Sequence, residues 1–223
     1  MPALPTALPT GTEESGLTET GLSGRPRIAV LVSGTGTNLQ ALIEAVEIGT
    51  IPAAIAVVLS DRPGVAALAR AQAAGIPAVV CDRAVYGSRV SGALSRAIPD
   101  DVRLVVLAGF LSILTEPLLD RFRRRIINIH PALLPRHGGP GMYGLHVHEA
   151  VLDAGDPETG CTVHFVDAGT DTGETLLQRT IPVIPGESAP ELARRLLPVE
   201  HEAIVEATRI MVQDRMYEST RHR

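Results

Sequence analysis

Residues 27–39 read RIAVLVSGTGTNL, and this stretch decides the fold class. The run 28–32 is wholly aliphatic, which is typical of a strand buried on both faces of a sheet. A loop rich in glycine and hydroxyl residues follows at 33–38. Apolar residues then recur at helical spacing, at Leu39, Leu42, Ile43 and Val46. The stretch therefore predicts a strand, a tight turn and a helix.

The same alternation continues along the chain. Further strands are expected at 54–59, 77–80, 104–108, 125–130, 160–166 and 175–183. Further helices are expected at 65–74, 88–97, 113–122, 147–153 and 191–216, the last one broken or restarted near Pro198. This order predicts an α/β fold with a doubly wound, mostly parallel, Rossmann-like sheet, whose ligands bind at the carboxyl ends of the strands.

Composition narrows the class of protein. The chain has 223 residues, is 45% hydrophobic and carries a net charge of −5, so a folded domain without a basic field for nucleic acid or anionic lipid is expected. Every basic residue apart from histidine is Arg. The absence of Lys excludes Schiff-base chemistry and the lysine of P-loop nucleotide-binding enzymes. A bound phosphate would have to be held by backbone N–H groups, hydroxyls or Arg.

The N-terminal residues and the two cysteines predict the cellular location of the protein. Residues 1–25 are rich in Pro, Thr, Gly, Glu and Ser, so we expect a disordered tail before one domain at 26–223. The tail lacks the apolar core of a secretory signal, and no apolar run is long enough to span a membrane. Cys81 and Cys161 are too few for a disulfide framework, and are expected to be buried in a reducing compartment. A cytoplasmic protein without a membrane partner is expected.

The loop at 33–38 is a candidate anion site. Gly34 and Gly36 permit a close approach of backbone to ligand, and Thr37 and Asn38 can cap the following helix. The dinucleotide fingerprint needs a third glycine where Leu39 stands, although Asp61 could act as its ribose-binding acid. A monophosphate fits best, while NAD binding or a purely structural glycine turn remain alternatives.

A second constellation ends the strand at 125–130. Asn128 and His130 are two residues apart, so their side chains share one face, and Pro131 then ends the strand. An amide beside an imidazolium can stabilise an oxyanion, as formyl transfer to an amine requires. Asp171, in a later polar loop, could pair with His130, raise its pKa and accept a proton. A capping Asn, a buried core His and an Asx-turn Asp are the structural alternatives.

Histidine spacing also raises a metal hypothesis. His164 lies in an expected strand, and His146 and His148 open an expected helix. Side chains two residues apart diverge on a helix, and no HExxH motif is present. We therefore expect no metal.

Four motifs together resemble one family. SGTGTN at 33–38, LAGF at 107–110, NIHPALLP at 128–135 and GCTVHFVDAGTDTG at 160–173 are similar in order and spacing to those of the phosphoribosylglycinamide formyltransferases of purine synthesis. The resemblance covers roughly 27–205. It implies transfer of a formyl group from 10-formyltetrahydrofolate to the glycinamide amine of a ribose 5-phosphate. The partners would be glycinamide ribotide and folate, and the chain would be a monomer or a homodimer.

The resemblance also implies roles for residues. Asn128, His130 and Asp171 would be catalytic. The ribotide would be bound by Gly36, Thr37, Asn38 and Glu200. The folate site would be lined by Arg89, Leu111, Ser112, Ile113, Leu114, Asn128, Asp167, Ala168, Gly169, Thr170 and Asp171, with backbone groups of Leu111 and Leu114 pairing with the pterin. A cis bond is expected before Pro135.

Three features depart from the family pattern. Ser112 stands where a basic residue is common. Leu197 replaces a Lys or Gln near the phosphate, which would then depend more on backbone or Arg194. The loop at 137–144, HGGPGMYG, is longer than the common form.

Rival functions share parts of the pattern. A 10-formyltetrahydrofolate hydrolase shares the NIHPALLP-type motif but usually has an added N-terminal domain. The formyltransferase acting on initiator methionyl-tRNA is usually longer and more basic. A non-catalytic nucleotide- or NAD-binding module is a third alternative.

Overall fold

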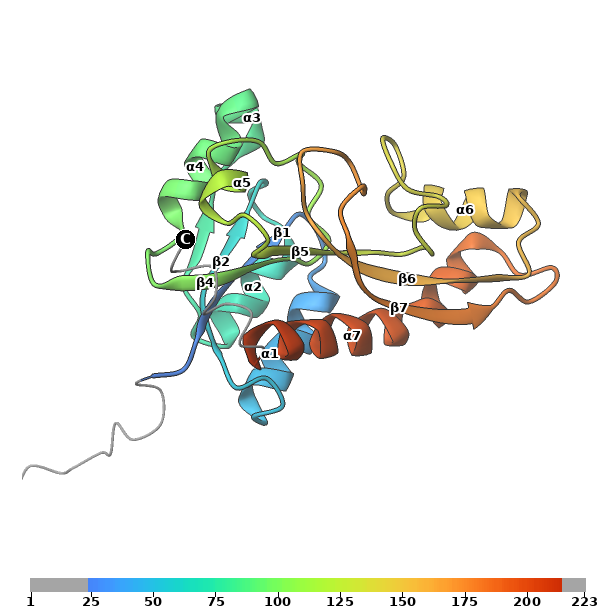
Figure 1. The fold of residues 1–223 in the computed structure, drawn as a ribbon, viewed down its shortest axis with the longest axis horizontal. Helices are drawn as coiled ribbons and strands as arrows, with labels where there is room; N and C mark the ends of the chain where they lie inside the picture. Colours follow the sequence, from blue (N-terminus) through green and yellow to red (C-terminus); the bar gives the residue numbers. More distant parts are fainter. Residues whose placement is uncertain (1–23, 214–223) are drawn as a thin grey trace, which may run out of the picture.

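The structure is a computed structural model that describes residues 24–213. The expected tail therefore lies almost entirely outside the described residues. One seven-stranded sheet has the order β3-β2-β1-β4-β5-β6-β7 (Figure 1). The strands are β1 (Arg27–Val32), β2 (Ala54–Ser60), β3 (Ala78–Val80), β4 (Val102–Leu107), β5 (Ile126–His130), β6 (Glu158–Phe165) and β7 (Thr175–Pro182). The strands from β1 to β5 pair in parallel, and β6 and β7 are antiparallel, so the predicted fold class is confirmed.

Helices cover both faces of the sheet (Figure 1). They are α1 (Thr37–Glu47), α2 (Ala66–Ala73), α3 (Arg83–Tyr86), the 3-10 helix η1 (Gly87–Arg89), α4 (Val90–Ala97), α5 (Leu118–Arg121), α6 (Leu145–Asp153) and α7 (Ala189–Gln213). Within residues 24–213, no helix combines the length and the apolar character needed to cross a membrane.

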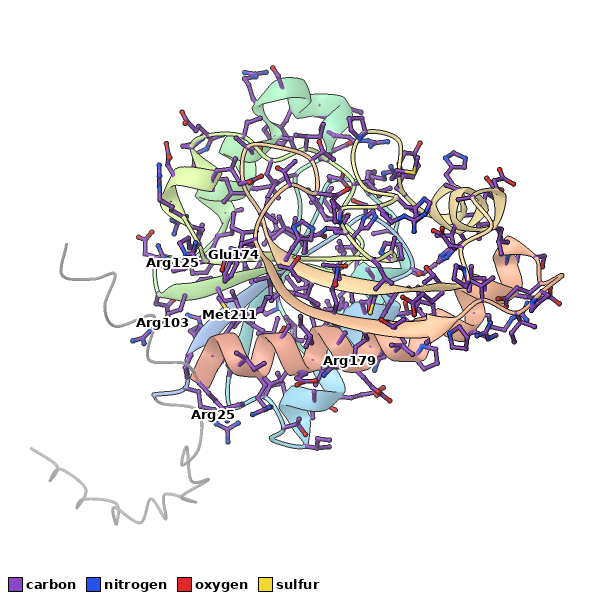
Figure 2. The ribbon with its side chains drawn as sticks, turned by 45° about the vertical axis from the view of Figure 1, so that its right-hand side comes forward. Arg25, Arg103, Arg125, Glu174, Arg179 and Met211 are labelled. Atoms are coloured by element: carbon purple, nitrogen blue, oxygen red, sulfur yellow. The ribbon has the colours of Figure 1, made fainter. Side chains whose placement is uncertain are left out.

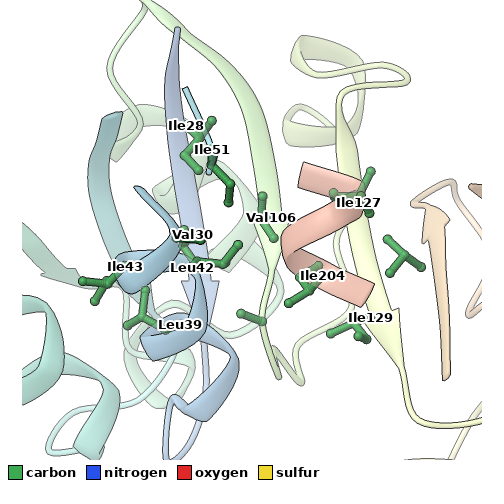
Figure 3. Packing of buried hydrophobic residues seen from close by; sticks show 14 of the residues in the cluster. Ile28, Val30, Leu39, Leu42, Ile43, Ile51, Val106, Ile127, Ile129 and Ile204 are labelled. Carbon is green, nitrogen blue, oxygen red and sulfur yellow. The ribbon is translucent and has the colours of Figure 1, made fainter. Parts of the chain in front are cut away.

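The core has two layers because the buried strands β1 and β4 are apolar at nearly every position. On β1, Ile28, Val30 and Val32 pack toward α1 and α7, whereas Ala29 and Leu31 pack toward α4 and α5. Figure 3 shows the first layer, in which Ile204 of α7 lies against the sheet. Both free cysteines, Cys81 and Cys161, are buried in these layers.

The predicted helix at 113–122 is wrong. Only 118–121 is helical, because proline disfavours the helical conformation in the residue before it and has no N–H to donate. The Glu116–Pro117 bond is cis, and Thr115 N–H donates to Ser91 Oγ at 2.9 Å. The segment between β4 and α5 is therefore mostly a non-helical loop, anchored by a side chain of α4.

Two other helices differ from expectation. The helix predicted at 88–97 is the last part of a longer helical stretch that starts at Arg83, where the Asp82 side chain accepts from Ala84 N–H. The C-terminal helix α7 is continuous to Gln213 despite Pro198 inside it. Arg179 of β7, labelled in Figure 2, forms an ion pair with Glu206 that links α7 to the sheet.

Loops meet at the carboxyl ends of β1, β4 and β5, where doubly wound sheets bind ligands. The loop after β6 joins them by folding back. It begins beside the first residue of β5, where Val166 N–H donates to Ile126 O, yet Asp171 reaches His130 at the other end of β5. The Leu134–Pro135 bond is cis, as the family resemblance implied.

Candidate active site

The structure brings Asn128, His130 and Asp171 together, and adds His164. Asn128 and His130 share one face of β5, and the antiparallel register sets His164 of β6 opposite Asn128. Asn128 Nδ2 lies 3.1 Å from His164 Nε2. His130 Nδ1 is 3.5 Å from one carboxylate oxygen of Asp171, and His164 Nε2 is 3.6 Å from the other. These distances are longer than a direct hydrogen bond, so the Asp171 carboxylate acts on both rings mainly through its charge.

Backbone carbonyls determine which ring nitrogens carry protons, because a carbonyl can only accept. His130 Nε2 is 2.8 Å from His137 O, so Nε2 is protonated and Nδ1 faces Asp171. His164 Nδ1 is 2.9 Å from Phe165 O, so that nitrogen carries the proton. In the neutral ring, His164 Nε2 then accepts from the Asn128 amide. The amide and both rings are thus held in fixed orientations.

Burial and charge oppose each other in the pKa values of this site. Burial lowers the pKa of His130, and the Asp171 carboxylate and the His137 carbonyl only partly offset it. We expected Asp171 to raise the pKa of His130. Its charge does act in that direction, but burial outweighs it because His130 is only 4% exposed.

The pKa of Asp171 ends below its ordinary value. Burial would raise it, but the neighbouring His164 and His130 rings and the Gly139 N–H, 3.0 Å from Asp171 Oδ2, together favour the carboxylate. An ionised acid therefore faces an imidazole nitrogen. Once His130 is protonated at Nδ1, such a pair can stabilise an oxyanion and move a proton to or from a reacting group.

The loop after β1 forms a second candidate subsite. Gly36 is the N-cap of α1 with φ 74°, and a Cβ at this position would lie 2.6 Å from the Ala67 side chain. Asn38 Nδ2 donates to Glu200 Oε2 of α7 at 3.3 Å, and the buried Asn38 Oδ1 has no hydrogen-bond partner in the described chain. The structure thus brings the predicted ribotide-binding residues together, and the free N–H groups of α1 can receive an anion there.

Burial raises the pKa of Glu200, although Asn38 partly offsets the effect.

Arg70 of α2 was missed by the sequence reasoning. Its Nε donates to Thr35 O at 2.9 Å, which places a guanidinium beside the glycine loop. The charge of Arg194, in contrast, acts on Glu191.

A cavity of about 620 Å³ lies between the loop after β4 and the loop after β6. Three of its lining residues, Leu114, Asp167 and Ala168, are predicted folate contacts. The sequence reasoning missed several apolar ones, Leu119, Phe165 and Val166. Asp167 shapes the loop by accepting from Gly169 N–H at 3.0 Å and from Thr172 Oγ1 at 2.7 Å.

Other predicted folate residues do not line this cavity. They are Arg89, Leu111, Ser112, Ile113, Asn128, Gly169, Thr170 and Asp171. Leu111 N–H donates to Ser33 Oγ at 2.8 Å, and Ile113 is 66% exposed. The Ser112 hydroxyl donates to Asp61 Oδ2 at 2.6 Å, and Asp61 is fully buried. Asp61 is therefore not available as a ribose-binding acid.

The histidines of the metal hypothesis are separated. His164 lies opposite Asn128 on β6, His146 is exposed beside the Tyr143 ring, and His148 is buried on α6. Within residues 24–213, no group of three or more His, Cys, Asp or Glu side chains is arranged to hold a metal ion.

Comparison with known proteins defines the class. Residues 26–208 match the model of the formyl transferase family, and the chain belongs to this family. A Haemophilus influenzae protein named phosphoribosylglycinamide formyltransferase is 40% identical over 79% of this chain and 82% of its own length. The crystal structure of glycinamide ribonucleotide transformylase 1 from Symbiobacterium toebii has a TM-score of 0.80 and 41% identity, and covers 89% of this chain and 93% of that one. Within its family, the chain belongs to the phosphoribosylglycinamide formyltransferases.

The same domain occurs inside longer proteins. A Drosophila melanogaster protein named trifunctional purine biosynthetic protein adenosine-3 is 42% identical over 84% of this chain. The chain spans 14% of that protein's length, so it corresponds to one part of it.

Proposed function

We propose that this chain transfers a formyl group from 10-formyltetrahydrofolate to the amine of N1-(5-phospho-D-ribosyl)glycinamide, giving formylglycinamide ribotide and tetrahydrofolate. The observation that carries the proposal is the grouping of Asn128, His130 and Asp171 at the end of β5. The anion site at the end of β1, with the Asn38–Glu200 bond, supports it as the place of the ribotide phosphate and glycinamide.

The chemistry follows from the side chains. The amine attacks the formyl carbon, and the Asn128 amide and His130, protonated at Nδ1, stabilise the negative charge that builds on the formyl oxygen. Asp171 accepts a proton from the attacking amine through a bridging water. The bond from the formyl carbon to folate nitrogen then breaks, and Asp171 returns its proton to that nitrogen through the same water. His164 positions both Asn128 and Asp171.

The folate is proposed to bind between the loop after β4 and the loop after β6. The cavity of about 620 Å³ there is lined by Leu114, Leu119 and Val166, which suit a flat heteroaromatic ring. Arg89, Leu111, Ser112, Ile113, Gly169 and Thr170, which do not line this cavity, remain proposed folate contacts. We propose further that no metal takes part, that the protein acts in the cytoplasm as a monomer or homodimer, and that residues 26–223 form one domain after a tail.

One assay separates this function from its rivals. Purified protein is mixed with 10-formyltetrahydrofolate, and tetrahydrofolate release is followed with and without glycinamide ribotide. Release that depends on the ribotide is expected. Release without it would identify a hydrolase, and NAD binding without any release would identify a nucleotide-binding module. Activity should survive prolonged chelation, whereas its loss would restore the metal hypothesis.

A further inference from the structure

The long loop at 137–144 contacts both proposed catalytic groups through its backbone. The carbonyl of His137 accepts from His130 Nε2–H at 2.8 Å, and the N–H of Gly139 donates to Asp171 Oδ2 at 3.0 Å. Two backbone groups of one turn therefore orient the imidazole and the carboxylate relative to each other.

The turn is tightly packed and uses unusual backbone angles. His137 has φ 52° and Gly139 has φ 96°, both in the left-handed region. A Cβ added at Gly138 would lie 2.5 Å from Leu134 Cδ2 and 3.3 Å from Asp171 Cβ. A non-glycine residue held at positive φ needs support from its surroundings.

That support comes from a clamp outside the site, formed by Arg136, His137 and Asp156. His137 Nε2 is 2.7 Å from Asp156 Oδ2, and the Arg136 guanidinium bonds Asp156 Oδ1. Asp156 lies between α6 and β6, and its side chain is 8% exposed. The bond from His137 is the main reason why the pKa of Asp156 lies below its ordinary value.

We propose that Asp156 and the His137 side chain are positioning residues for formyl transfer, holding the turn whose backbone orients His130 and Asp171. This inference rests on the proposed function. Neither side chain needs to touch a substrate. Loss of the clamp would release the His137 carbonyl from His130, so the ring would be free to change tautomer and orientation.

The kinetic test compares Asp156→Ala and His137→Ala with Asp153→Ala, which removes an exposed carboxylate from the end of α6. Because a displacement of about 1 Å at a catalytic group can cost on the order of a hundredfold, we expect kcat to fall at least about tenfold in both clamp variants. In the clamp variants, KM for both substrates should stay within about twofold to threefold of wild type. In the control variant, kcat and KM should both stay within that range. Asp156→Asn, which keeps an acceptor for His137, should retain more activity than Asp156→Ala. The double variant should be no slower than the worse single one, because both changes break the same link.

A spectroscopic test works without substrates. Nitrogen-15 NMR of the His130 ring, assigned with His130→Gln, should show the single Nε2–H tautomer in wild type at pH 8. The clamp variants should show a mixture of tautomers. A fall in kcat with unchanged His130 signals, or a kcat within twofold of wild type in both clamp variants, would overturn the proposal. If Asp156→Ala does not fold, His137→Ala decides. A wild-type protein that transfers no formyl group would refute the proposed function, and the NMR result would still test the clamp.

Discussion

Asn128 can be changed with little disturbance to the fold, since it is half-buried and its side chain makes one hydrogen bond within residues 24–213, to His164. Asn128→Ala removes a donor to the developing oxyanion. We expect kcat to fall by roughly 10²–10³, or about 3–4 kcal/mol. Steady-state kinetics measure the loss, and a urea unfolding curve close to that of wild type serves as the control. If kcat of Asn128→Ala equals that of wild type, the proposed role of Asn128 is refuted.

Gly36 is a residue where backbone conformation and packing both require glycine. Gly36→Ala places a Cβ at positive φ and 2.6 Å from the Ala67 side chain. Gly49 has φ 80° with open space around it, so Gly49→Ala tests the conformational cost alone. We expect Gly49→Ala to cost about 1–2 kcal/mol of unfolding free energy, and Gly36→Ala about 1–3 kcal/mol more.

Urea unfolding of both glycine variants gives these differences. The ribotide KM should rise only in Gly36→Ala, because that change moves the N-terminus of α1. Equal destabilisation of the two variants would show that the contact with Ala67 is not the reason for glycine at position 36.

Some site residues were predictable from local spacing and others were not. Asn128 and His130 share a face because strand side chains alternate, which the sequence shows directly. His164 was considered only as a metal ligand, since its place opposite Asn128 depends on an antiparallel register that spacing along the chain does not reveal. His137 contributes its carbonyl, and a backbone group leaves no side-chain signal.

At the scale of elements, the segment between β4 and α5 shows where periodicity misleads. Its apolar residues at helical spacing predicted a helix, but Pro117 prevents one over most of that length. The segment is instead held by three polar contacts from other elements, at Ser33, Asp61 and Ser91. Such long-range anchors depend on the tertiary fold and could not be predicted locally.

Ser112→Ala tests whether these anchors serve the proposed folate site. It removes the hydrogen bond that the Ser112 hydroxyl donates to Oδ2 of the buried Asp61 carboxylate. The other oxygen, Oδ1, has no hydrogen bond within the described residues and lies 4.0 Å from the Arg62 guanidinium. We expect a loss of about 1–3 kcal/mol of unfolding free energy. We also expect a severalfold higher KM for 10-formyltetrahydrofolate with little change in kcat.

Ser88→Ala, at an exposed serine in η1, is the matched control. Denaturant unfolding and folate titration of both variants give the comparison. Unchanged stability and folate KM in Ser112→Ala would show that the Asp61 contact does not support the loop.

For the whole molecule, the sheet was predictable because nearly every position of β1 and β4 is apolar, as burial on both faces requires. Helices on both sides follow from that pattern. The antiparallel end formed by β6 and β7 was expected only as a pair of strands, because no connecting helix lies between them. The folding back of the loop between them, which brings Asp171 to His130, depends on tertiary contacts such as the Gly139 bond.

Buried histidines link the stability of the whole molecule to pH. Burial lowers the pKa of His130 and of His148, and both residues are 4% exposed. Below pH 6.5, which is about the ordinary pKa of histidine, these side chains are protonated in the unfolded chain but remain neutral in the folded protein. The contribution of the two neutral histidines to the unfolding free energy is therefore complete above that pH. It is lost as the pH falls toward their pKa values in the folded protein.

We expect the unfolding free energy to decrease between pH 7.5 and pH 5.5, by at most about 1.4 kcal/mol per pH unit for each such histidine. Urea unfolding across this range measures the slope. His148→Gln should make it shallower, whereas His146→Gln, at an exposed position two residues earlier on α6, should leave it unchanged. Equal slopes in wild type and His148→Gln would mean that His148 accepts its proton in the folded protein as readily as in the unfolded chain.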